Sequence, residues 1–143
     1  MEIGKALGRH IPFASLLGVH LREHGGGRAV LEVELVPELL NSFGAAHGGV
    51  IMTVLDIAMA VAARTKDPKA VGAITVEMKT SFLATGNGRL VVEGNCIQFG
   101  RSVAFCEGEA RDAGGALVAR ASGTFMVRRA PGGQDDTLPA KDA

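Results

Sequence analysis

The apolar segment from Gly48 to Ala63 (GGVIMTVLDIAMAVAA) constrains the fold more than any other part of the sequence. Only Thr53 and Asp56 interrupt it, so it lacks the polar stripe that an amphipathic surface helix shows. The segment is long for a strand, is rich in Ala and Met, and has no period of two. We therefore expect a long helix that is buried on most sides. Because Asp56 interrupts the apolar run, no transmembrane helix is expected.

The other segments predict strands, because apolar and polar residues alternate along them. The expected strands are residues 16–24, 29–35, 70–83, 90–99, 102–111 and 117–127. Short turns join the later strands, which indicates hairpins and an antiparallel sheet. One face of the last two strands carries small residues, which would let the helix lie close: Ala104, Cys106, Gly108, Ala110, Ala119, Ala121 and Gly123. The prediction is an α+β fold in which a curved antiparallel sheet of about five strands wraps around one buried helix.

Length and charge limit the number of domains and the classes of partner. A chain of 143 residues has the size of one domain. We place that domain at residues 16–128, after an N-terminal segment at 1–15 that could hold a short helix and before a flexible tail at 129–143. Fifteen basic and fifteen acidic residues balance to a net charge of +0, which removes the electrostatic argument for nucleic acid or an anionic membrane as partner. Two cysteines and a charged start without an apolar run favour the cytoplasm.

The sequence around the helix start points to acyl-transfer chemistry. Asp56 lies in the middle of the apolar helix, where an unpaired carboxylate would cost several kcal/mol, unless a hydroxyl such as Thr53 satisfies it. Gly48 and Gly49 stand at the helix N-terminus, where unpaired N–H groups and the positive end of the dipole favour developing negative charge. Polarising a carbonyl oxygen requires such donors. His47 and Asn41 flank the same point.

Helix geometry adds a constraint on any joint role of Gly48 and Asp56. Eight residues of helix span about 12 Å, whereas hydrogen-bond reach is about 3 Å. One chain therefore cannot bring its own Asp56 to a carbonyl that its own Gly48 N–H holds. If both groups serve one reaction, Asp56 must come from a second copy across a twofold axis, which predicts an obligate dimer.

The chain resembles the hotdog-fold acyl-CoA thioesterases typified by the phenylacetate-pathway thioesterases, over about residues 11–128. The pattern that carries the resemblance is Asn41-x5-His47-Gly48-Gly49-x6-Asp56. Weaker support comes from Ile74-Thr75-Val76-Glu77-Met78 and from Gly100-Arg101.

The resemblance implies a role for each matching residue. The Gly48 N–H, beside His47 and Gly49, would bind and polarise the thioester carbonyl. Asp56 of the facing subunit would be the nucleophile or the general base that activates water, and Asn41 would help to hold the water or the thioester.

The resemblance also suggests two further substrate contacts, each with an alternative. Thr75 matches a Ser or Thr that touches the water, although strand alternation places it with Glu77 and Lys79, opposite the apolar Ile74 and Val76, unless a bulge intervenes. Gly100 and Arg101 match a position that contacts the nucleotide end of CoA, although an ordinary hairpin turn explains them equally well.

The expected function is hydrolysis of small or medium acyl-CoA or aroyl-CoA by a homodimer with shared active sites. Relatives often assemble as dimers of dimers, and no metal or organic cofactor is needed. Two alternatives stay open: a hotdog dehydratase acting on hydroxyacyl thioesters, and a non-catalytic acyl-CoA binder or sensor that would not need Asp56.

Overall fold

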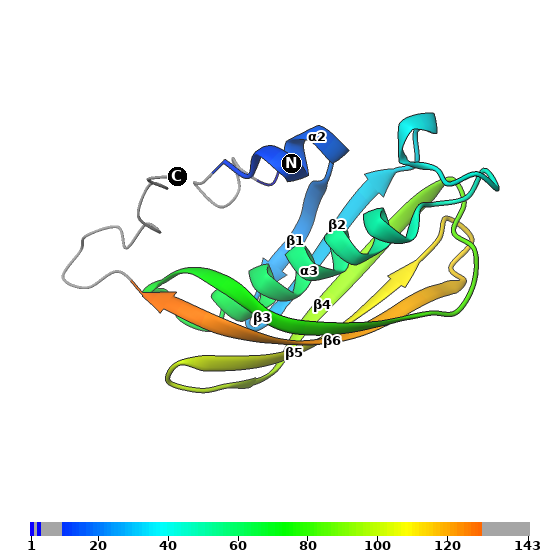
Figure 1. Cartoon of the computed structure of the whole chain (residues 1–143). Coiled ribbons are helices and arrows are strands. Elements are labelled where there is room, and N and C mark those ends of the chain that lie inside the picture. The colour runs from blue at the N-terminus through cyan, green and yellow to red at the C-terminus, as the bar shows by residue number, and fades with distance from the viewer. Residues whose placement is uncertain (2, 4–9, 130–143) are drawn as a thin grey trace, which may run out of the picture.

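Six antiparallel strands form one curved sheet in the computed structural model, which describes residues 1, 3 and 10–129 (Figure 1). The strands lie in the order β1-β2-β4-β5-β6-β3. Their bounds are β1 His20–Gly25, β2 Arg28–Glu34, β3 Ala70–Phe82, β4 Arg89–Phe99, β5 Val103–Arg111 and β6 Leu117–Arg129. Each of the six expected strand segments contains a strand, and all six join one sheet, with β1 paired to β2 at an edge, so the sheet is slightly larger than the expected size of about five strands.

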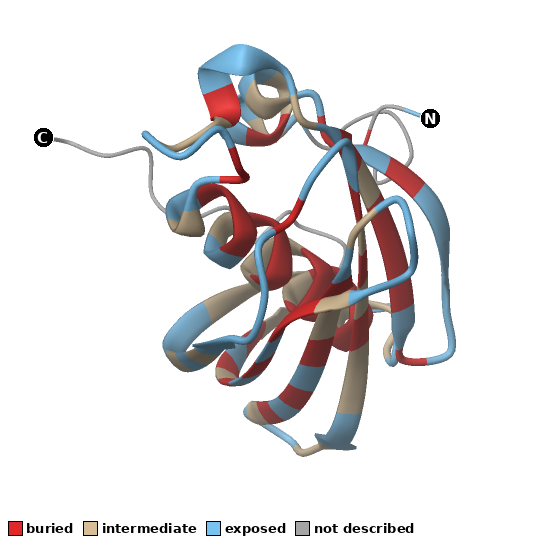
Figure 2. Cartoon of the chain, turned by 90° about the vertical axis from the view of Figure 1, so that its right-hand side faces the viewer, coloured by how far each residue is buried: buried red, intermediate tan, exposed pale blue. Residues whose placement is uncertain are grey.

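Helix α3 (Gly48–Arg64) lies against one face of this sheet, and the sheet curls around it (Figure 1). The predicted helix is confirmed, and its burial is one-sided: the side facing the sheet is buried and the opposite side is not (Figure 2). Strands β5 and β6 show the expected alternation of buried and less buried residues. Together these features are the hotdog fold that the resemblance implied. Within the described residues, no helix combines the length and apolarity needed to cross a bilayer.

The closest approach between α3 and the sheet lies at Gly94 on β4. A methyl group on Gly94 would lie 2.5 Å from the carbonyl carbon and oxygen of Ala58 and 2.7 Å from the backbone nitrogen of Met59. The helix backbone therefore touches the sheet directly there, which only glycine permits. Small residues on β5 and β6 are buried as expected, but the sequence analysis did not single out Gly94.

The N-terminal part of the chain differs from the prediction. Residues 16 and 17, expected in a strand, belong to the short helix α2 (Pro12–Leu17). Pro12 supplies the fixed φ that suits a first helical position, and Gly18 ends the helix in the left-handed conformation at φ 73°. The boundary drawn between residues 15 and 16 therefore falls inside α2. Residues 2, 4–9 and 130–143, which include nearly all of the predicted tail, lie outside the described residues.

Two register shifts interrupt β3 and change which side chains face α3. One of them lies between Thr75 and Glu77, so Val76 is an extra residue in the strand. Thr75 pairs with the fully buried Phe125, and Met78 pairs with Gly123. Thr75 therefore lies on the helix side together with Met78. Simple alternation grouped Thr75 with Glu77 and Lys79, and this grouping is wrong, because the bulge reverses the alternation between Thr75 and Glu77.

Candidate active site

Asp56 meets Thr75 across the gap between α3 and β3. The Thr75 hydroxyl donates to the Asp56 Oδ1 atom at 2.5 Å, a length typical of a charge-assisted O–H···O⁻ bond. The bulge at Val76 makes this contact possible, because it turns Thr75 toward the helix. Thr53 is not the partner, since its hydroxyl donates to the Gly49 carbonyl at 2.7 Å. Asp56 is half-buried rather than deeply buried.

The start of α3 is built by His47, which caps the helix. The His47 Nδ1 atom accepts a hydrogen bond from the Gly49 N–H at 2.8 Å, so the ring nitrogen that faces the backbone carries no proton. The Gly49 N–H is thereby used within the chain, and its predicted contact with substrate stays a prediction. The Gly48 N–H, in contrast, has no acceptor among the described residues. The helix terminus thus offers one unpaired N–H at the position that the sequence predicts for a carbonyl oxygen.

Asn41 organises the loop that leads to this terminus. Its Oδ1 atom accepts from the Phe43 N–H at 2.9 Å and the Ala45 N–H at 3.2 Å, and its backbone N–H donates to the Ala45 carbonyl at 2.7 Å. The side-chain oxygen is therefore occupied by the loop itself. The amide NH₂ of Asn41 has no acceptor in the described part of the chain, so a contact with water or thioester remains a prediction for that group alone.

One chain supplies two separate halves of the predicted site. Gly48 is the first residue of α3 and Asp56 follows eight residues later, which places them about 12 Å apart along the axis. The Phe82 ring packs beside Gly48, since a Cβ atom on Gly48 would lie 3.4 Å from this ring. The sequence gives no signal for this contact, because no local pattern pairs residues 48 and 82.

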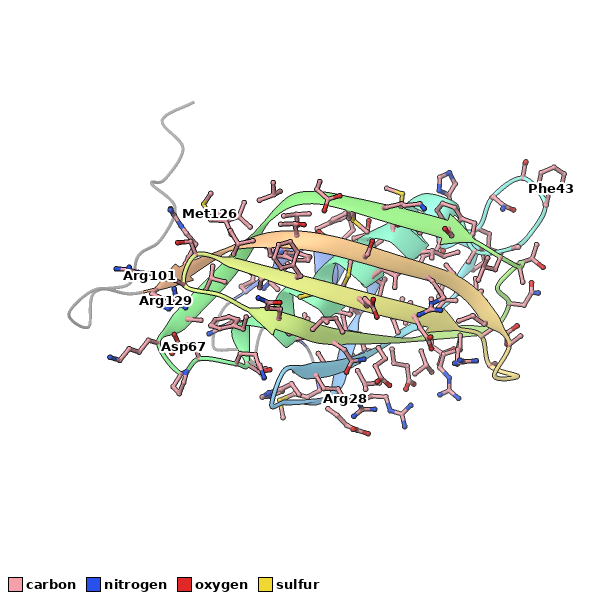
Figure 3. All side chains as sticks on the ribbon, turned by 90° about the horizontal axis from the view of Figure 1, so that it is seen from below. Arg28, Phe43, Asp67, Arg101, Met126 and Arg129 are labelled. Carbon is pink, nitrogen blue, oxygen red and sulfur yellow. The ribbon has the colours of Figure 1, made fainter. Side chains whose placement is uncertain are left out.

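Gly100 and Arg101 lie far from the helix start of the same chain. Figure 3 shows Arg101 at one end of the sheet, close to Asp67 and Arg129, and Phe43 at the opposite end. The Arg101 side chain is exposed, and its carbonyl accepts from Arg129. The Arg129 guanidinium donates to Asp67 at 2.7 Å and holds the pKa of that carboxyl below its usual value. The structure therefore does not bring Arg101 together with Gly48 within one chain.

The two cysteines and the residue types that bind metals form no further reactive centre in the described residues. Cys96 and Cys106 are free and face each other across β4 and β5, and burial raises the pKa of both thiols. Raised thiol pKa values disfavour the reactive thiolate. Within the described ranges, no three His, Cys, Asp or Glu side chains cluster in a way that could hold a metal ion.

Comparison with known proteins identifies the family. The model of the thioesterase superfamily matches residues 43–119. A protein of Saccharolobus solfataricus named as an esterase is 33% identical over 129 residues, which cover 90% of this chain and 89% of that protein. The Escherichia coli PaaI protein of the phenylacetic acid degradation operon superimposes with a TM-score of 0.79 at 20% identity, covering 87% of this chain and 90% of that one. A Streptococcus mutans protein solved with acetyl-CoA gives a TM-score of 0.71 at 25% identity, covering 78% and 89%. The chain belongs to the thioesterase superfamily and is a thioester hydrolase.

Proposed function

We propose that the protein hydrolyses small or medium acyl-CoA or aroyl-CoA thioesters to the free acid and CoA, with Asp56 and the Gly48 N–H as its central groups. The observation that carries the proposal is the hydrogen bond from Thr75 to Asp56. It fixes one carboxylate oxygen and leaves the other without a partner among the described residues. A carboxylate held in this way is positioned to act on water or on a carbonyl carbon.

The reaction follows from the two halves of the site. The thioester carbonyl oxygen accepts from the Gly48 N–H, which stabilises the negative charge that develops on it. In the general-base route, Asp56 takes a proton from water while the water oxygen attacks the carbonyl carbon. The C–S bond then breaks, CoA leaves as the thiolate, and the proton held by Asp56 passes to the sulfur. In the nucleophilic route, the Asp56 oxygen attacks the carbonyl carbon, the C–S bond breaks and CoA leaves as the thiolate. Water then hydrolyses the resulting anhydride, which gives the free acid, regenerates the Asp56 carboxylate and supplies the proton for the CoA sulfur.

The 12 Å separation requires a shared site, and two observations support one. β3 is an edge strand of 13 residues whose outer edge has no partner within the described chain, and long unpaired edges favour pairing with a second copy. The midpoint between Gly48 and Asp56 is Met52, whose side chain is 41% exposed. A twofold axis near Met52 would bury this residue against its own copy. It would also bring each Gly48 opposite the second copy's Asp56.

The same arrangement gives Arg101 a role. Antiparallel helices place the C-terminal end of one α3 beside the N-terminal end of the other, and Arg101 lies at the C-terminal end (Figure 3). Arg101 of the second copy would then face the CoA part of a thioester held at Gly48, where a guanidinium suits phosphate. The acetyl-CoA bound by the Streptococcus mutans relative supports a CoA thioester as substrate. We place the enzyme in the cytoplasm, where free thiols such as Cys96 and Cys106 are usual, and leave a dimer of dimers as the expected assembly.

The first test is CoA release from a panel of acyl-CoAs and aroyl-CoAs by the wild type and Asp56→Ala. We expect at least a hundredfold loss of kcat in the variant with acyl-CoA binding retained. Activity that does not depend on Asp56 would contradict the mechanism, and binding without turnover in the wild type would favour the acyl-CoA binder.

The role of the Gly48 N–H has a test of its own. Proline at a first helical position keeps the helix, removes the N–H and adds a small ring, so Gly48→Pro should abolish turnover. Gly48→Ala is the matched control, because its methyl group meets the Phe82 ring at an ordinary 3.4 Å and the N–H stays.

A mixing experiment tests the shared site. Asp56→Ala and Gly48→Pro chains, each inactive alone, are unfolded and refolded together. Random pairing makes about half of the dimers mixed, each with one intact site, so about a quarter of wild-type activity should return. A site contained within one chain would regain none.

A further inference from the structure

A small apolar cavity lies beside α3 on the side of Asp56 away from the helix start. Its volume is about 130 Å³, and its walls are Ile11, residues Ala60, Val61 and Arg64 of α3, and residues 71–73 at the beginning of β3. Most of these residues are half-buried, so the cavity reaches the surface. Arg64 is the charged member of the lining, and its Nε atom donates to the Ala70 carbonyl at 3.3 Å.

The cavity lies next to the Asp56–Thr75 pair along both α3 and β3, although neither residue lines it. Ala60 follows Asp56 by four residues, so it lies on the same face of α3 one turn further on. Ala73 precedes Thr75 by two residues on β3, and its partner Val127 is buried on the helix side, as is the partner of Thr75. Ala60 is thus the next residue on the Asp56 face of the helix, and Ala73 is the next residue on the Thr75 face of the strand. A chain attached to a carbonyl at Asp56 has a direct path between them.

We propose that this cavity receives the acyl group and limits the substrate to a short chain. The proposal rests on the proposed function, since it places the carbonyl carbon at Asp56. An apolar protein cavity of about 150 Å³ holds a benzene molecule. A cavity of 130 Å³ therefore accepts roughly four to six carbon atoms beyond the carbonyl. The small side chains at 60 and 73 make this space, because larger residues at either position would fill it.

The test measures kcat/KM for saturated acyl-CoAs from acetyl to decanoyl. Each methylene buried in an apolar site contributes about fourfold to binding, so the wild type should improve up to about hexanoyl and then gain nothing more. Ala60→Leu should lower the ratio of hexanoyl to acetyl kcat/KM at least tenfold. Val71→Ala should move the optimum to longer chains by one or two carbon atoms. Ala116→Leu adds the same bulk on the exposed turn between β5 and β6 and should leave the profile unchanged.

A second measurement separates this proposal from the proposed function. Calorimetric titration with the same acyl-CoA series on the wild type and the variants reports chain-length selectivity whether or not turnover occurs. If nothing is hydrolysed but Ala60→Leu still removes the gain from longer chains, the acyl pocket stands and the catalytic proposal fails. The opposite result is a chain-length profile for Ala60→Leu and Val71→Ala that runs parallel to the wild-type profile. The profile is measured in turnover or, if no turnover occurs, in binding. That result would mean that the cavity does not hold the acyl group, and it would overturn the proposal.

Discussion

The contact between Gly94 and the backbone of α3 makes a prediction that links packing to activity. A methyl carbon at 2.5 Å from the Ala58 carbonyl atoms falls about 1 Å short of an ordinary contact distance of roughly 3.5–4.0 Å. Backbone atoms cannot move aside as a flexible side chain can, so Gly94→Ala must push α3 away from β4. Asp56 is only two residues before Ala58, so the carboxylate should move by a similar amount relative to Thr75.

Two magnitudes follow from this displacement. Overpacking a well-filled core costs about 1–3 kcal/mol, and a clash against backbone belongs at the upper end. A loss of about 3 kcal/mol lowers the Tm of a domain of this size by about 10 °C. A shift of about 1 Å in a catalytic group can lower the rate about a hundredfold. The activity loss should therefore persist at temperatures where circular dichroism shows the variant to be folded.

A graded series of glycine substitutions checks this reasoning. A methyl group on Gly108 would meet the flexible Leu55 side chain at 3.0 Å and the Glu93 carbonyl oxygen at 3.3 Å, so Gly108→Ala should lose less stability than Gly94→Ala. At Gly114 the nearest atom is Asp112 Oδ1 at an ordinary 3.5 Å, so Gly114→Ala should be close to neutral. The Tm values and kcat should rank in that order. A Gly94→Ala variant with wild-type Tm and kcat would refute the proposed contact between helix and sheet.

Three further predictions concern single contacts. Thr75→Val removes the hydroxyl that donates to Asp56 and should lower kcat about ten- to a hundredfold, because a hydrogen bond to a charged group contributes about 1.5–3 kcal/mol. Thr75→Ser keeps a hydroxyl and should restore most of the lost kcat. Equal kcat values for Thr75→Val and Thr75→Ser would contradict a role for this hydrogen bond. His47→Ala removes the cap from the Gly49 N–H and should cost about 1 kcal/mol in urea unfolding, whereas His47→Asn should recover it. Burial raises the pKa of Cys106, so the unfolded thiol ionises first and wild-type stability should fall as the pH rises above about 8.5, by at most about 1.4 kcal/mol per pH unit. Urea unfolding at pH 7 and pH 10 should show a smaller fall in Cys106→Ala, and an equal fall would contradict the assignment.

The sequence predicted the helix and most strands because their signals are local. A run of apolar residues from 48 to 63 and alternation with a period of two are properties of neighbouring residues. The bulge at Val76 is not local in this sense, since it depends on how β3 pairs with β6. Simple alternation therefore put Thr75 on the wrong face. The family resemblance predicted a site role for Thr75, which stays a prediction; the structure shows that the bulge turns Thr75 toward Asp56.

Two other differences also arise from tertiary packing. Residues 16 and 17 are apolar enough for a strand. They lie in a short helix instead, because Pro12 favours a helix start and Gly18 favours a helix end. Gly94 on β4 lies outside the row of small residues on β5 and β6, and no local pattern marks it as a contact with the helix. Which strand lies directly under the helix backbone depends on the strand order in the sheet, and the crossover that places β4 beside β2 does not follow from any single segment.

The uncovered side of α3 explains why the helix is apolar nearly all round. Counting in fours from the helix start gives Gly48, Met52, Asp56, Ala60 and Arg64, and none of these five residues is buried. Residues four apart form one ridge on a helix surface, and such ridges are what neighbouring helices pack against. A ridge left open to water would be expected to carry polar side chains, whereas this one holds a glycine, a methionine and an alanine around a single carboxylate. In the proposed dimer a second copy covers this ridge, which would account for its apolar members. The carboxylate and the unpaired Gly48 N–H would then be the groups left for chemistry, so the proposed dimer and the proposed active site rest on the same row of residues.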